Sequence, residues 1–175
     1  SWSQLISDKK DLAGLPDHIV VQAKERATEA KQNGWLLTLD MPTYLAVLTH
    51  ADNAALRETF YRAYTTRASD QSPNKDQWDN TKTLNTILSK RNALASLLGF
   101  SNYAELSLET KMVRKPEDVL AFLNQLADAS FQKAKKEFEQ LCHYAKESLH
   151  FPTVNAWDVA YVSEKLRQHH YAISE

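Results

Sequence analysis

The six histidines are the residues of this chain best suited to bind a metal ion. Two histidines four residues apart on one helix present both ring nitrogens on the same face, as zinc sites require. No pair of histidines has that spacing, and the carboxylate–histidine pair Glu139 and His143 is of a kind common on ordinary helix surfaces. We therefore predict no metal ligand on this chain and no cofactor bound to it.

Nucleophilic and phosphate-binding chemistry is also missing from the sequence. Cys142 is followed by His143, but neighbours on a helix point about 100° apart and do not form a catalytic pair. Cys142 lies beside Leu141 in an apolar stripe and is best explained as a small core thiol. The three glycines stand apart, so no loop can cradle a phosphate, and no two carboxylates stand out as an acid/base couple. We predict no catalytic residue here.

One arginine interrupts an apolar stripe. Arg91 lies among leucines at helical spacing, and an unpaired buried charge is strongly unfavourable. Its guanidinium must extend to water or find a carboxylate. The stripe of the last predicted helix, which contains Trp157 and Tyr161, also contains Glu164. We expect Arg91 to pair with Glu164 or Asp158, with extension to water as the alternative.

Helices are expected to position nearly all of these residues. Helical spacing of apolar residues, with proline or a capping residue before it and glycine after it, predicts helices over 16–33, 80–99 and 116–148, and Asn80 is the expected cap of the second. Shorter helices are predicted over 43–50 and 53–68, and a last one over 155–168. Asn155 can cap this last helix, and Asp158 lies three residues later, as in a capping box. The apolar run 35–39, between Gly34 and Asp40, predicts a short strand, and 171–173 is a second candidate.

These patterns predict a mainly α fold, elongated, with one or two short strands. The helix over 116–148 is the reason for expecting an elongated form, because some thirty residues at 1.5 Å each give a rod of roughly 45 Å. The chain is predicted to be a single helical segment over 1–175. The polar stretch 69–77 is expected to be a mobile surface loop.

Composition excludes several classes of function. The chain is 43% hydrophobic and carries a formal charge of −1, so it can bury a core but has no broad basic surface for nucleic acid. No apolar run approaches the roughly 20 residues that cross a bilayer. A single cysteine cannot form an internal disulfide, which favours a cytoplasmic location.

Several short motifs follow one another along the chain. They are LAGLP at 12–16, GWLLTLD at 34–40, Arg57 with YRAYTTRASD at 61–70, and WDN at 78–80 followed by Arg91, LLGF at 97–100, NYA at 102–104 and KM at 111–112. A further motif, WDxxYxxEK at 157–165, follows downstream. In this order and spacing, the motifs resemble those of the thimet oligopeptidase family of zinc metallopeptidases.

The resemblance implies a helical, two-lobed peptidase in which a zinc ion, held by H-E-x-x-H and a downstream glutamate, hydrolyses short peptides. This chain would form about a quarter of such an enzyme, from its middle, in the lobe that flanks the substrate channel. The zinc motif would lie beyond residue 175, so the chain would be inactive alone. Trp35 and Tyr161 are candidates for lining the channel.

A second hypothesis is a freestanding helical module that binds a peptide or a partner helix. If the chain is instead a fragment of the peptidase, helix faces that pack against the missing lobes would be exposed as apolar patches and would promote self-association.

Overall fold

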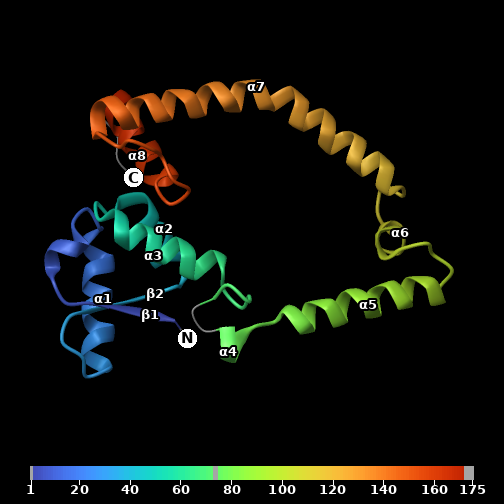
Figure 1. Ribbon diagram of the computed structural model, residues 1–175, viewed down its shortest axis with the longest axis horizontal. Coiled ribbons are helices and arrows are strands. Elements are labelled where there is room, and N and C mark those ends of the chain that lie inside the picture. The colour runs from blue at the N-terminus through green and yellow to red at the C-terminus, as the bar shows by residue number, and fades with distance from the viewer. Residues whose placement is uncertain (1, 73–74, 172–175) are drawn as a thin grey trace. The chain divides into compact units, whose positions relative to one another are not determined.

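The computed structural model describes residues 2–72 and 75–171, and it is mainly helical (Figure 1). The predicted mainly α class is therefore confirmed. The chain divides into two compact units. Unit 1 contains residues 1–67, 71–73 and 139–175, and unit 2 contains residues 68–70 and 74–138.

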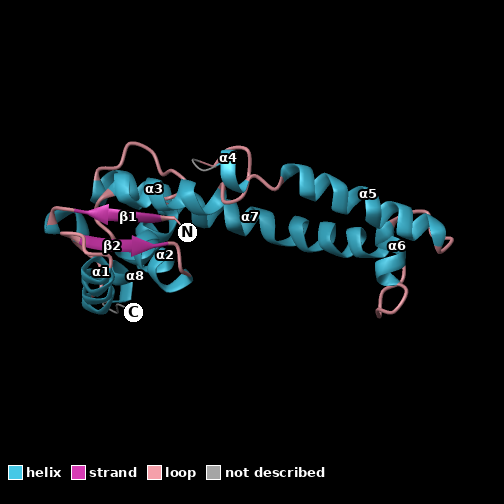
Figure 2. Cartoon of the chain, turned by 90° about the horizontal axis from the view of Figure 1, so that it is seen from below, coloured by secondary structure: helices cyan, strands magenta, loops and turns pink. Residues whose placement is uncertain are grey.

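A two-stranded antiparallel sheet lies in unit 1. Strand β1 (Ser3–Ile6) pairs with β2 (Trp35–Thr38), so that Ile6 lies opposite Trp35 (Figure 2). The predicted strand at 35–39 is thus confirmed, one residue shorter. Gly34 has φ +127°, and a Cβ there would lie 2.3 Å from the carbonyl oxygen of Ile6, so only glycine allows the two strands to meet.

Three helices complete the first part of unit 1. They are α1 (Asp17–Glu29), α2 (Met41–His50) and α3 (Ala54–Thr65), and a 3₁₀ turn, η1 (Lys9–Leu12), precedes them. Asp40 caps α2 by accepting from the backbone N–H of Thr43 at 3.1 Å, and Asn53 caps α3 by accepting from that of Ala55 at 3.0 Å. The main core includes Ile19, Leu37, Val47 and Phe60.

The last part of unit 1 joins the end of α7 (Pro116–Leu149) to α8 (Val159–Tyr171). Leu141 and Ala145 of α7 form a second core with Tyr161 and Val162 of α8. The candidate strand at 171–173 is wrong at Tyr171, because this residue is the last of α8. Residues 172 and 173 lie outside the described residues.

Unit 2 contains α4 (Lys75–Trp78), α5 (Thr81–Leu97), α6 (Tyr103–Leu108) and the first two thirds of α7. The helices predicted over 80–99 and 116–148 are confirmed. Asn80 was expected to cap α5, but its side chain makes no capping bond, and Asp79 instead accepts from the backbone N–H of Thr81 at 2.9 Å. Ala95 is the one buried residue among those described in this unit.

Within 2–72 and 75–171, no helix is both long enough and apolar enough to cross a bilayer.

Candidate functional site

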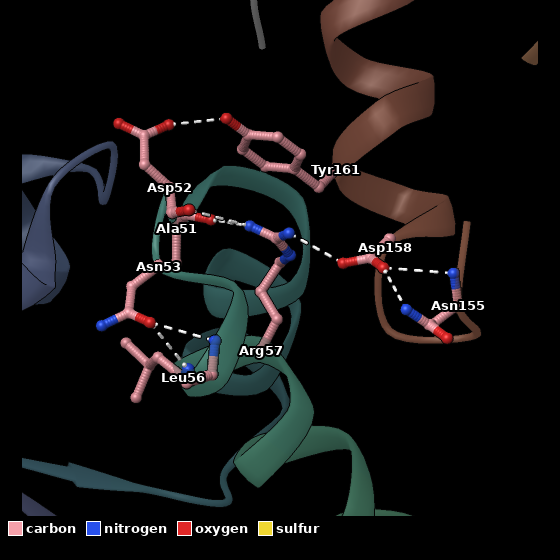
Figure 3. A network of polar contacts seen from close by, with 9 residues as sticks. Ala51, Asp52, Asn53, Leu56, Arg57, Asn155, Asp158 and Tyr161 are labelled. Atoms are coloured by element: carbon pink, nitrogen blue, oxygen red, sulfur yellow. Dashed lines mark hydrogen bonds and ion pairs between the residues drawn. The ribbon is translucent and has the colours of Figure 1, made fainter. Parts of the chain in front are cut away.

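A buried arginine connects the two cores of unit 1. The side chain of Arg57, on α3, is fully buried, and its Nη2 donates to Oδ1 of Asp158 at 2.7 Å (Figure 3). Its Nη1 donates to the carbonyl oxygens of Ala51 at 2.6 Å and Asp52 at 3.2 Å. These carbonyls follow the C-terminal end of α2, where the helix dipole is negative, so they favour a cation.

Asp158 holds the start of α8 while it pairs with Arg57. Its second oxygen, Oδ2, accepts from the backbone N–H and from the side-chain amide of Asn155, both at 3.1 Å. This is the backbone half of the capping box expected from Asn155 and Asp158. The carboxylate is therefore fixed by three hydrogen bonds, and both its charge and its orientation serve the ion pair with Arg57.

Two aromatic rings cover the guanidinium. Arg57 Cζ lies 4.1 Å from the ring centroid of Tyr161 and 5.7 Å from that of Phe151. Such contacts are favourable because the ring faces are electronegative. In the part of the chain that the structure describes, Arg57 Nε is buried without a hydrogen-bond partner.

The hydroxyl of Tyr161 reaches the loop after α2. It donates to Oδ1 of Asp52 at 2.8 Å (Figure 3). Lys165 Nζ lies 3.6 Å from the same oxygen. Burial, together with the hydrogen bond to Asp52 and its charge, raises the pKa of Tyr161 to about 12. The tyrosine is therefore a neutral donor at every physiological pH and is unsuited to release a proton.

Glu164 belongs to a separate ion pair on α8. Its Oε2 accepts from Arg167 Nη2 at 2.6 Å and its Oε1 accepts from Gln168 Nε2 at 2.6 Å. Burial raises the pKa of Glu164, but the hydrogen bonds from Gln168 and Arg167 and the arginine's charge outweigh it, so the pKa is lowered overall.

The three charged residues predicted to pair lie in different surroundings. Asp158 and Glu164 are both in ion pairs, with Arg57 and Arg167 of their own unit. Arg91 lies in unit 2, where its Cζ is 5.1 Å from the ring centroid of Tyr103. Asp158 lies just before α8 and Glu164 lies within it, and the ion-pair partner of each is an arginine other than Arg91.

The channel candidates differ in their surroundings. Trp35 is half-buried on β2, and Lys24 Nζ lies 5.0 Å from its ring centroid. Tyr161 is buried between Arg57, Phe151 and Asp52. Whether either one contacts a peptide stays a prediction.

Metal-binding groups do not gather in the described residues. Within 2–72 and 75–171, no three side chains of histidine, cysteine, aspartate or glutamate lie close enough together to hold a metal ion. Cys142 is half-buried beside the second core. The described residues therefore do not fit a zinc site.

Comparison with known proteins identifies the family. The model of peptidase family M3 matches residues 47–175. The chain belongs to peptidase family M3. It is 49% identical over 174 residues to oligopeptidase A of Salmonella typhimurium, and 40% identical over 186 residues to a probable cytosolic oligopeptidase A of Arabidopsis thaliana. Dipeptidyl carboxypeptidase of Escherichia coli is 27% identical over 176 residues.

These matches cover nearly all of this chain but little of the relatives. They include 99%, 99% and 100% of the chain, and 26%, 25% and 25% of the three relatives. The chain thus spans about a quarter of the length of the M3 peptidases that it matches. The family resemblance read from the motifs is confirmed.

Sequence reasoning did not single out Arg57 as an ion-pair residue. A signal was present, because Arg57 lies on α3 among the buried residues Leu56, Phe60 and Ala63. Arg91 was singled out for the same feature, an arginine among apolar residues at helical spacing. The partner could not be deduced, because Asp158 is 101 residues away in the sequence.

Proposed function

We propose that these 175 residues form part of a zinc-dependent oligopeptidase that hydrolyses short peptides in the cytoplasm. The observation that carries the proposal is the 49% identity to oligopeptidase A, which extends over 99% of this chain but only 26% of the relative. Identity that extends over nearly the whole of a chain, and covers so small a share of its relative, is what a segment of a larger enzyme would show.

The proposed role of the segment is structural: it is a helical part of the lobe that flanks the substrate channel. The buried pair of Arg57 and Asp158 supports this role, because it fixes α8 to α2 and α3 through interactions that require no ligand. Trp35 and Tyr161 are proposed to face the channel in the intact enzyme.

The chemistry is assigned to residues outside this segment. A zinc ion in a peptidase lowers the pKa of its bound water and polarises the scissile carbonyl. The described residues offer no cluster of donors for such an ion. We therefore expect the segment to be inactive alone.

A quenched-fluorescence peptide of about eight residues tests the proposal. The 175-residue chain is compared with the longer gene product that contains it, each at equal concentration and with or without a chelator. We expect hydrolysis by the longer protein alone, abolished by the chelator and restored by zinc. Hydrolysis by the 175-residue chain, or no hydrolysis by either protein, would contradict the proposal.

The freestanding binding module is the second candidate. The observation that favours it is the exposure of large apolar residues along α5 and α7, such as Leu88 and Phe131. The gene distinguishes the two candidates: a reading frame that continues past residue 175 into H-E-x-x-H supports the peptidase, and a stop codon there supports the module.

A further inference from the structure

The sequence contains a single Asn-Gly pair, Asn33 with Gly34, and the pair lies in the bend between α1 and β2. At every other asparagine of the chain, the next residue carries a side chain. Such a side chain hinders the approach of its own backbone nitrogen to the asparagine amide, and glycine removes this hindrance. Asn33 is therefore the asparagine whose side-chain amide is most open to attack by the following peptide nitrogen.

The structure leaves both of these groups without a hydrogen bond. Asn33 is exposed, and among the hydrogen bonds of the described residues none involves its side chain or the backbone N–H of Gly34. The sheet begins one residue later, where Trp35 lies opposite Ile6. The last N–H held by the end of α1 is that of Gln32. The Gly34 nitrogen thus lies outside both elements, and no acceptor holds its proton.

Other asparagines of the chain lack this combination. The side chains of Asn53 and Asn102 accept from the N–H groups of the helices that they cap, and that of Asn155 donates to Asp158. A second group lies inside helices: Asn85, Asn92 and Asn124. In a helix the following N–H donates to a carbonyl one turn earlier and is not available to attack.

We propose that Asn33 is a site of spontaneous deamidation and isoaspartate formation. The backbone nitrogen of Gly34 loses its proton to water and forms a bond to Cγ of Asn33, and the side-chain nitrogen leaves as ammonia. The product is a five-membered succinimide. Water then adds to one of its two carbonyls: breaking the bond between Cγ and nitrogen gives aspartate, and breaking the original peptide bond gives isoaspartate. Water is the one co-reactant, and nothing is oxidised or reduced.

The two products differ in their effect on unit 1. Aspartate adds one negative charge at an exposed side chain and changes the formal charge of the chain from −1 to −2. Isoaspartate adds the same charge and also routes the backbone through Cβ and Cγ, which inserts one carbon just before β2. At Gly34 a Cβ would lie 2.3 Å from the carbonyl oxygen of Ile6, so the pairing of β1 with β2 leaves little room for a shift there. Isoaspartate, unlike aspartate, therefore weakens the sheet.

Incubation of the 175-residue chain for several weeks, at neutral pH and physiological temperature, tests the proposal. Tryptic digestion gives one peptide, 32–57, which contains Asn33 and also Asn53 as an internal control. Mass spectrometry should show a gain of about one mass unit, from the replacement of NH₂ by OH, at Asn33 and not at Asn53. Protein isoaspartate methyltransferase with a labelled methyl donor should then methylate the same peptide.

Two variants and an unfolded sample are the controls. Asn33→Gln keeps an exposed amide but would have to close a larger ring, so it should gain neither mass nor label at this position. Freshly purified Asn33→Asp carries the charge of the product on an unaltered backbone, and the aged parent chain should have a lower urea midpoint than this variant. The parent chain in guanidinium chloride gives the rate without the fold, and we expect the folded chain to react within about tenfold of it, because exposed loops open at little cost.

Three results would overturn the proposed site: no mass gain at Asn33, an equal gain in Asn33→Gln, or a folded chain that reacts more than about tenfold slower than the unfolded one. The last result corresponds to an opening cost above about 1.4 kcal/mol at this bend. An aged chain as stable as fresh Asn33→Asp would refute the effect on the sheet. None of these results bears on peptide hydrolysis, so this inference and the proposed function succeed or fail separately.

Discussion

Removing Asp158 should destabilise unit 1 strongly, because it leaves the guanidinium of Arg57 buried without its counter-charge. The Arg57 side chain has no exposed surface and that of Asp158 has 4%, so water cannot replace the carboxylate. Breaking a buried ion pair from one side costs about 3–5 kcal/mol. The Asp158→Ala variant also loses the acceptor of two hydrogen bonds from Asn155, so we expect the upper half of that range.

The remaining contacts of Arg57 limit the loss without abolishing it. The carbonyls of Ala51 and Asp52 and the ring of Tyr161 stay beside the cation in the variant. They supply partial negative charge but no counter-ion. Replacing both members of the pair, as Arg57→Met with Asp158→Ala, removes the stranded charge. The double variant should therefore be more stable than Asp158→Ala alone, by about 1–3 kcal/mol.

Urea unfolding followed by tryptophan fluorescence measures these effects. Trp2, Trp35 and Trp157 all lie in unit 1, and Trp157 immediately precedes Asp158. Glu58→Ala is the matched control, because it removes the partner of Arg62 in an exposed pair and should cost less than about 1 kcal/mol. A loss below about 1 kcal/mol for Asp158→Ala, or strictly additive effects in the double variant, would refute the reasoning.

Three further predictions concern other residues of this unit. Spectrophotometric titration should show a tyrosine that ionises near pH 12 and is missing from the titration of Tyr161→Phe. Because folding raises the pKa of Tyr161, its contribution to stability is present below pH 10 and is lost as the pH rises towards 12. An unchanged titration in the variant would count against the assignment. Folding lowers the pKa of Glu164, so this residue contributes stability above its unfolded pKa, and the contribution is lost in more acidic solution. The urea midpoint should therefore fall less between about pH 5 and 3 in Glu164→Gln than in the parent chain. An equal fall in the two proteins would contradict this prediction. In the intact peptidase, Trp35→Ala should raise KM several-fold with little change in kcat if the ring contacts the peptide, and an unchanged KM would remove Trp35 from the channel.

The long helices were predictable from the sequence because their signals are local. Pro116 with two acids begins α7, and Gly99 lies just beyond α5, as helix-start and helix-stop rules require. Strand β1 was missed, because four residues with a weak alternation specify a strand only when a partner such as β2 is present. The cap of α5 was misassigned by one residue, which is within the usual uncertainty of helix ends.

The charged centre of unit 1 could not be deduced in the same way. Its members come from α3, from the loop after α2 and from the start of α8, and their proximity is a product of tertiary packing. The sequence indicated Asp158 and Glu164 as ion-pair residues, with Arg91 as the expected partner. An arginine within an apolar stripe can be recognised from the sequence, but its distance from a carboxylate cannot. Arg57 met the same local criterion and is the residue that Asp158 binds.

We propose that this segment supports a catalytic centre that lies outside it. The decisive measurement is the zinc content after dialysis against about micromolar zinc and then buffer, determined by elemental analysis. We expect well under one zinc per 175-residue chain and close to one per molecule of the longer peptidase. One tightly held zinc per 175-residue chain would contradict the proposal.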